Sequence, residues 1–239
     1  MDNGIYASLT RQSGLMREMR VIANNIANAN TNGFRREGVI FSEYLTATGD
    51  GREGLSMANA RGRVLDLEQG GMSMTGGTYD LAIDGDGFFA VDTPQGTRIT
   101  RAGAFLASAD GELMTPNGHR LLDEGLGPIQ IPPGTKQVAI GPDGTLSADG
   151  LQLARVGLFA APDPAAMLRS GGTLFETGDA ALQPAEDARI QQGFLEDSNV
   201  EPIAEISRMI EVQRAYEMGQ TLLDREDKRI RDAITALTR

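Results

Sequence analysis

The stretch IYASLTRQSGLMREMRVIANNIANANTNG, residues 5–33, decides how the N-terminal end of this chain folds. Its side chains follow an a/d pattern with alternating intervals of four and three residues, apolar at six of seven positions: Ile5, Leu9, Gln12, Met16, Met19, Ala23 and Ile26. This periodicity predicts a helix of coiled-coil type from about Ile5 to Asn30. We expect it to stop near Asn32-Gly33, because glycine readily takes the left-handed conformation that closes a helix.

The same periodicity returns at the C-terminal end, from about Asn199 onward. The a/d positions there are Ile206, Met209, Gln213, Tyr216, Gln220, Leu223, Asp227, Ile230, Ile234 and Leu237. Ser198 or Asn199 is a suitable N-cap, and Pro202 is tolerated in a first helical turn, where its missing N–H would be unpaired in any case. Two long helices with continuous apolar seams need each other to bury those seams, and also predict contacts with other chains.

Glycine and turn signals replace the helical period between the two ends. Six Asp-Gly pairs and one Asn-Gly pair separate short apolar runs: Asp50-Gly51, Asp84-Gly85, Asp86-Gly87, Asp110-Gly111, Asn117-Gly118, Asp143-Gly144 and Asp149-Gly150. These pairs favour hairpins, because type I′ turns need positive φ at both central residues. The middle of the chain is therefore predicted to be antiparallel β structure.

The sequence thus predicts an α+β fold in which long N- and C-terminal helices pack as a coiled-coil-like helical domain beside a central antiparallel β-rich domain. We expect residues 1–41 to form the N-terminal half of the helical domain with a following loop, 42–193 the β domain and 194–239 the C-terminal half. The formal net charge is −11, of which residues 47–193 contribute −9, so the helical ends are close to balanced. Such ends can pack densely, whereas an acidic domain is better placed in solvent.

Composition excludes several classes of function. The 239 residues include no cysteine and one histidine, His119, which removes thiolate metal sites, disulfides and multi-histidine metal centres. The excess of 33 acidic over 22 basic residues argues against nucleic-acid binding. No apolar run is long enough to cross a membrane, and the N-terminus lacks the features of a cleaved secretory signal. We expect no cofactor, no metal and no catalysis.

Two other functions remain open from the residues alone. Paired carboxylates in the β domain would make a hydrolase, and a concave aromatic surface would make a carbohydrate-binding module. The run Asp84-Gly85-Asp86-Gly87 superficially resembles a calcium loop but lacks the later oxygen ligands, so it is interpreted as a turn.

Three ordered motifs resemble those of bacterial flagellar rod and hook proteins. The first is residues 23–35, ANNIANANTNGFR; the second comprises residues 80–89, DLAIDGDGFF, and 100–105, TRAGAF; the third comprises residues 198–200, SNV, and 209–217, MIEVQRAYE. The resemblance covers essentially the whole chain. The opening residues 1–6, MDNGIY, and the modest length are most similar to a proximal-rod member, with a distal-rod or other axial member as the alternative. Gly219 departs from the asparagine expected there in a distal-rod member.

The resemblance implies a structural subunit of the flagellar rod, which crosses the periplasm and transmits motor torque to the hook. The partners it implies are other copies of the chain, other rod proteins and the type III export apparatus, with export that leaves no cleaved signal peptide. The terminal helices would then carry the subunit contacts. The candidate assembly residues are Ile5, Leu9, Met16, Met19, Asn24, Asn25, Ile26, Asn28, Gly33, Phe34, Ile206, Met209, Gln213, Arg214, Tyr216 and Leu223.

Polar residues within the seams have two interpretations. Asn24, Asn25 and Asn28 are predicted to bond neighbouring subunits and fix their register, as a buried polar residue does in a coiled coil, whereas Asn30 and Asn32 are better explained as helix-ending residues. Polar positions also recur at every seventh residue of the C-terminal seam, at Gln213, Gln220 and Asp227. They make either specific contacts or a solvent stripe, while Tyr216 and Phe34 are predicted to be buried anchors.

Overall fold

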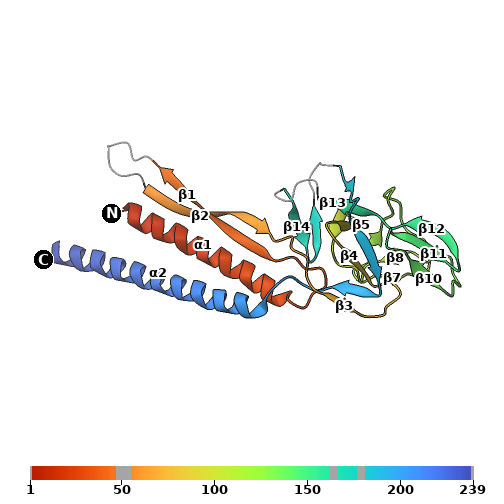
Figure 1. Cartoon of the computed structure of the whole chain (residues 1–239). Helices are drawn as coiled ribbons and strands as arrows, with labels where there is room; N and C mark the ends of the chain where they lie inside the picture. The colour runs from red at the N-terminus through yellow and green to blue at the C-terminus, as the bar shows by residue number, and fades with distance from the viewer. Residues whose placement is uncertain (1, 47–54, 162–165, 177–180, 238–239) are drawn as a thin grey trace. The chain divides into compact units, whose positions relative to one another are not determined.

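The computed structural model describes residues 2–46, 55–161, 166–176 and 181–237 (Figure 1), with side chains described outside 2–7, 41–46 and 55–61. The fold is α+β, with a helix at each end and antiparallel strands between them, as predicted. Two compact units share the chain. We call residues 1–27, 37–64 and 201–239 the helical unit, and residues 28–36 and 65–200 the β unit.

The helical unit is built around α1 (Asp2–Ala27) and α2 (Pro202–Leu237), which lie side by side in Figure 1. They run antiparallel, since Gln12 contacts Tyr216 whereas Asn25 contacts Glu205. The first helix ends before Asn30, earlier than predicted. Asn28 ends it by folding into a tight turn in which its carbonyl accepts the Thr31 N–H at 3.0 Å and its side chain accepts the Thr31 hydroxyl at 3.2 Å.

Two strands also belong to the helical unit, β1 (Glu37–Thr46) and β2 (Leu55–Leu65), which pair with each other. This division differs from the expected boundary at residue 42. Residues 28–36 join the β unit instead of extending the first helix, and residues 37–64 join the helices. The difference has a local cause, because the Asn25 side chain holds both backbone groups of Glu37, at the start of β1, against α1.

The β unit contains antiparallel strand pairs grouped into four sheets in its described part. The largest sheet has the order β14 (Leu168–Gly171), β15 (Leu174–Glu176), β6 (Gly96–Thr100), β5 (Phe88–Thr93), β9 (Arg120–Leu121), β8 (Leu113–Met114), β7 (Leu106–Ala107), with β13 (Leu158–Ala160) pairing β5 and β16 (Gln183–Pro184). The others are β10 (Val138–Ile140), β11 (Thr145–Ala148), β12 (Leu151–Arg155); β4 (Leu81–Asp84) with β17 (Arg189–Gln192); and β3 (Met72–Met74) with β18 (Phe194–Glu196).

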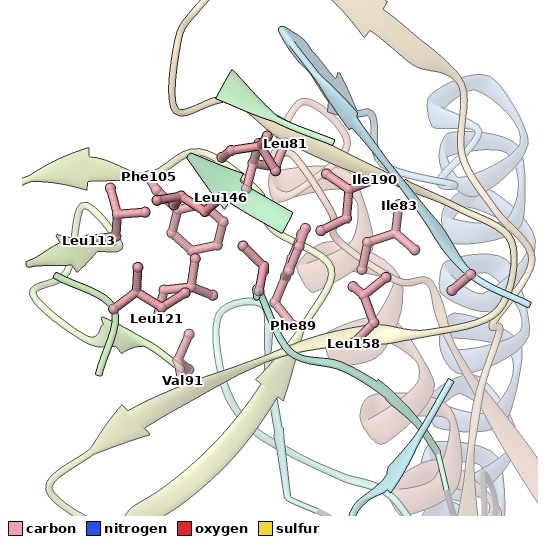
Figure 2. Close-up of a cluster of buried hydrophobic side chains, with 14 of the residues drawn as sticks. Leu81, Ile83, Phe89, Val91, Phe105, Leu113, Leu121, Leu146, Leu158 and Ile190 are labelled. Carbon is pink, nitrogen blue, oxygen red and sulfur yellow. The ribbon is translucent and has the colours of Figure 1, made fainter. Parts of the chain in front are cut away.

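Strand β5 lies at the centre of the β unit and has apolar packing on both faces. Alternate residues point to opposite sides of a strand, so Phe89 and Val91 enter the main core while Phe88 and Ala90 enter two smaller clusters. In Figure 2 side chains from several strands converge on Phe89. Its ring meets that of Phe105 edge-on with centroids 5.3 Å apart. An apolar run without alternation, like residues 88–91, is what a strand covered on both faces requires.

Four of the predicted pairs lie in hairpin turns between paired strands, though mostly of another type than predicted: Asp110-Gly111, Asn117-Gly118, Asp143-Gly144 and Asp149-Gly150. Asp84-Gly85 and Asp86-Gly87 join β4 to β5, which do not pair with each other, and Asp50-Gly51 lies outside the described residues. Among these four described turns, Asp149-Gly150, between β11 and β12, is the one with positive φ at both residues, at 50° and 84°. The turns at Gly111, Gly118 and Gly144 use a left-handed glycine alone. In each of them the glycine N–H bonds the carbonyl three residues earlier, the pattern of a type I turn followed by a left-handed residue.

Candidate assembly surface

An apolar seam joins α1 to α2 inside the helical unit. Leu15, Ile22 and Val212 are buried at its centre. Partly buried side chains flank them: Met19, Ile26, Met209, Ala215 and Tyr216. The predicted a/d seams are therefore partly right, but their centre is displaced, because Leu15, Ile22 and Val212 stand outside the predicted a/d positions. The packing of two apolar seams is confirmed, while a coiled-coil geometry stays a prediction.

Polar contacts fix the register of the two helices. The Gln12 side-chain amide donates to the Tyr216 carbonyl at 3.1 Å. Arg208 pairs with Glu18 at 2.8 Å, and this hydrogen bond raises the pKa of the Arg208 guanidinium. These contacts specify one alignment, because sliding either helix by a turn would leave partly buried polar groups unpaired.

Gly219 makes room for the Gln12 contact. A Cβ at this position would lie 2.6 Å from Nε2 of Gln12, well inside van der Waals contact. Glycine in a helix interior costs about 1 kcal/mol relative to alanine. The departure from asparagine noted in the sequence therefore has a structural explanation, since no larger residue fits here without displacing Gln12.

The opposite side of α2 is also apolar, and it is exposed. Ile203 is 83% exposed, Met218 67% and Leu222 52%. Ile206 and Ile210, both about half exposed, complete a stripe with intervals of three, four and eight residues. Val212 follows Ile203 by nine residues, which is half a turn out of phase at 3.6 residues per turn. The helix thus has one apolar side against α1 and a second facing outward.

Twelve of the candidate assembly residues divide into three groups by burial. Met19, Ile26, Met209 and Tyr216 pack in the α1–α2 seam. Met16, Asn28 and Leu223 are half-buried, while the exposed group contains Leu9, Asn24, Ile206, Gln213 and Arg214. Ile5 belongs to α1, but its side chain lies outside the described residues. Gln213 and Gln220 bond within α2, to Glu217 and to the Tyr216 hydroxyl. Subunit contacts by the exposed group stay a prediction.

Three of the candidates, Asn25, Gly33 and Phe34, lie in the interior of the subunit, and any contact of theirs with a neighbouring subunit stays a prediction. Asn25 is fully buried, donating to the Glu37 carbonyl at 2.8 Å and to Glu205 at 3.1 Å, so its amide is occupied within the chain. Phe34 is also fully buried, with the Arg169 guanidinium 4.2 Å from its ring centroid. Gly33 has φ +68°, and its N–H donates to the Glu196 carbonyl at 2.8 Å.

Sequence reasoning missed a buried ionic cluster in the β unit, formed by Arg35, Arg101 and Glu196. Its only sequence signal was an arginine next to apolar and glycine residues in two of the motifs, GFR and TRAG. The β unit also has a cavity of about 440 Å³ whose lining includes Thr31, Thr100, Asn117 and His119. His119 follows the turn at Gly118, as expected.

In the part of the chain that the structure describes, no three His, Asp or Glu side chains gather as a metal site would. None of the helices within that part is long and apolar enough to cross a membrane.

Comparison with known proteins agrees with this geometry. Three families match the chain: "Flagella basal body rod protein" over residues 5–35, "Flagellar hook protein FlgE/F/G D1 domain" over 82–148 and "Flagellar basal body rod FlgEFG protein C-terminal" over 191–236. The flagellar basal-body rod protein FlgF of Caulobacter vibrioides is 41% identical, with 99% of this chain and 98% of that protein covered. The chain belongs to the flagellar basal-body rod protein family.

Other rod proteins are similar over nearly the same length. FlgF of Mesorhizobium japonicum is 37% identical over 99% of this chain and 98% of its own length. The rod protein FlgG of Bacillus subtilis is 30% identical over 98% of each chain. Within the family this chain is thus most like FlgF. It is a structural rod protein and not an enzyme.

Proposed function

We propose that this rod protein occupies the proximal rod and assembles through its terminal helices. The observation that carries the proposal is the second apolar side of α2, from Ile203 to Leu222. Within the described residues its side chains stay about half exposed or more, whereas α1 buries Val212 on the other side of the helix. An apolar stripe of this length is typical of a surface that is buried on association. Similarity to FlgF above FlgG supports the proximal position.

In this proposal the partners are other copies of the chain and other rod proteins, and the assembled helices transmit torque to the hook. Contacts of this kind are heterologous and do not close on themselves, so they build a helical shaft. The rod lies in the periplasm, and the subunit reaches it through the type III export apparatus without a cleaved signal. The absence of cysteine suits assembly in an oxidising compartment, because no accidental disulfide can form.

A charge placed in the exposed stripe tests the proposal. Met218→Glu puts a carboxylate at a position that is 67% exposed in α2, so the free chain should fold normally by circular dichroism. In cells lacking their own copy, this variant should fail to form complete basal bodies and fail to swim, because assembly would bury an unpaired charge.

The matched control is Met74→Glu, since Met74 on β3 is 78% exposed in the β unit. This variant should support normal swimming. Full motility with Met218→Glu would overturn the assembly surface, and failure of the unmodified chain to restore motility would overturn the rod function itself. A variant at Met209 would be less informative, because Met209 also packs in the internal seam.

A further inference from the structure

A cluster of charged side chains is buried inside the β unit. Glu196, Arg35 and Arg101 are each at most 2% exposed. The Glu196 carboxylate accepts from Arg35 through Oε1, and from Nη1 of Arg101 through Oε2 at 3.2 Å. One carboxylate therefore serves two guanidiniums away from water. Such an arrangement is costly to form and still more costly to break, because removing one charge leaves the others buried without compensation.

The two arginines depend on Glu196 to different degrees. Arg101 also donates to the carbonyls of Ile83 at 3.2 Å and Gly85 at 2.6 Å, and its guanidinium lies 5.3 Å from the Phe88 ring centroid. Nε and Nη1 of Arg35 are buried and have no hydrogen-bond partner among the described residues. Glu196 is thus the group that compensates the charge of Arg35.

Glu196 also connects backbone segments that are far apart in sequence. Its Oε1 accepts the Gly70 N–H at 3.0 Å, and its carbonyl accepts the Gly33 N–H at 2.8 Å. The neighbouring Asn199 repeats the pattern, with its Oδ1 accepting the Arg36 N–H at 2.7 Å and its Nδ2 donating to the Asp66 carbonyl at 3.1 Å. We call the three segments 33–36, 66–70 and 196–199 the clasp.

The position of the clasp in the chain gives it a mechanical consequence. The chain passes between the helical unit and the β unit at 27/28, 36/37, 64/65 and 200/201. Segment 33–36 ends at the second junction, 66–70 begins one residue beyond the third, and 196–199 ends one residue before the fourth. The first junction leads directly into the loop 28–36. Every covalent connection between the two units therefore enters the β unit through a segment held by Glu196 or Asn199.

We propose that the clasp transmits force between the helical unit and the β unit, with Glu196 as its central positioning residue. The proposal rests on the function as a rod subunit. A force that enters through a single unclasped segment can peel it from the β unit one hydrogen bond at a time. Segments held by Glu196 and Asn199 instead carry the force together, because none of them can move without breaking a bond to one of these two residues.

Glu196→Gln tests the proposal in the full chain. The substitution keeps the size of the side chain but removes the charge that compensates Arg35 and Arg101. The matched control is Glu124→Gln, the same change in the same unit at an exposed pair with Arg155. In the purified protein, we expect amide hydrogen exchange in the three clasp segments to be at least about a hundredfold faster for Glu196→Gln and unchanged for Glu124→Gln.

The mechanical test uses cells that lack their own copy and carry each variant, with motor rotation measured on attached beads of increasing size. Glu196→Gln should rotate small beads as the unmodified chain does and lose speed at least about twofold on the largest beads. Glu124→Gln should match the unmodified chain at every load. Asn199→Ala, a milder change at a half-buried residue, should fall between the two and provides the test if Glu196→Gln does not accumulate.

The outcomes distinguish a failure of the proposed rod function from a failure of the proposed force transmission by the clasp. If the unmodified chain fails to restore rotation, the rod function is wrong regardless of the clasp. If rotation is restored and both clasp variants turn the largest beads at full speed despite faster exchange, the clasp does not transmit force. Unchanged exchange in Glu196→Gln would overturn the central position of Glu196.

Discussion

The two units of this rod protein use apolar side chains in opposite ways. In the six-residue strand β5 five residues are buried, whereas in the 36 residues of α2 the buried ones are Glu205 and Val212. Exposed apolar side chains occur along α2, from Ile203 to Leu237. The β unit therefore has a buried core of its own, whereas α2 buries few residues and keeps one apolar side exposed along its length. The contrast fits the proposed function, in which the helical unit carries the subunit contacts.

The largest expected effect compares a core position of the β unit with an exposed position of α2. Phe89→Ala should lower the free energy of unfolding of the β unit by about 3–5 kcal/mol, because it opens a cavity among fully buried neighbours. Ile203→Ala should change the stability of the free chain by less than about 0.5 kcal/mol. Chemical denaturation followed by circular dichroism measures both. Similar losses for the two variants would remove the contrast between the units.

A smaller effect tests whether residues 28–36 belong to the β unit. Gly33→Ala should cost about 2–4 kcal/mol, because φ is +68° and the new Cβ would lie 2.3 Å from the Ala102 backbone nitrogen. Gly118→Ala has φ +83° but no atom within 4 Å of the new Cβ, so it should cost about 1 kcal/mol from the backbone conformation alone. Equal melting temperatures for the two variants would show that Gly33 is not closely packed.

Within the helical unit, Gln12 and Gly219 should behave as a coupled pair. Gly219→Ala gains about 1 kcal/mol of helix propensity but forces the Gln12 amide away from the Tyr216 carbonyl, so alone it should be neutral or destabilising. In a Gln12→Ala background the same substitution should stabilise the helices by about 1 kcal/mol. A double-mutant cycle of thermal unfolding measures the coupling, and simple additivity would contradict the contact.

The smallest effect is a pH dependence in the β unit. Hydrogen bonds from the hydroxyl and N–H of Thr145 lower the pKa of Asp143 below its ordinary value of 3.8. A lowered pKa contributes stability that is present above the unfolded value and is lost as pH falls through the folded value. Asp143→Asn should therefore flatten the acid limb of the stability profile below about pH 3.8 and leave neutral pH nearly unchanged. An identical acid limb in the two proteins would remove this contribution.

Much of the fold could be predicted because local patterns encode it. Seven-residue periodicity located both terminal helices, and Asp-Gly or Asn-Gly pairs located several hairpins. Periodicity does not, however, specify which partner covers a face. The predicted seam therefore missed Leu15, Ile22 and Val212, which pack against each other only because of the tertiary alignment.

Polar and glycine residues were the hardest to interpret, because the same chemistry serves internal and external contacts. Asn25 could bond a neighbouring subunit or the strand that follows α1, and only the structure shows that Glu37 and Glu205 occupy its amide. Glu196 gave no sequence signal, since its partners lie about 160 and 95 residues away. Long-range contacts of this kind depend on topology and are not encoded by spacing.

The central claim is that assembly buries the outer side of α2. Oxidation of exposed methionines tests it most directly, because each unit contains a largely exposed methionine. Met218 on α2 and Met74 on β3 are both largely exposed in the free chain. If assembly buries the outer side of α2, oxidative footprinting should find Met218 protected in isolated basal bodies and Met74 as reactive as in the free chain. Equal reactivity of Met218 in the free chain and in the assembled rod would contradict the account.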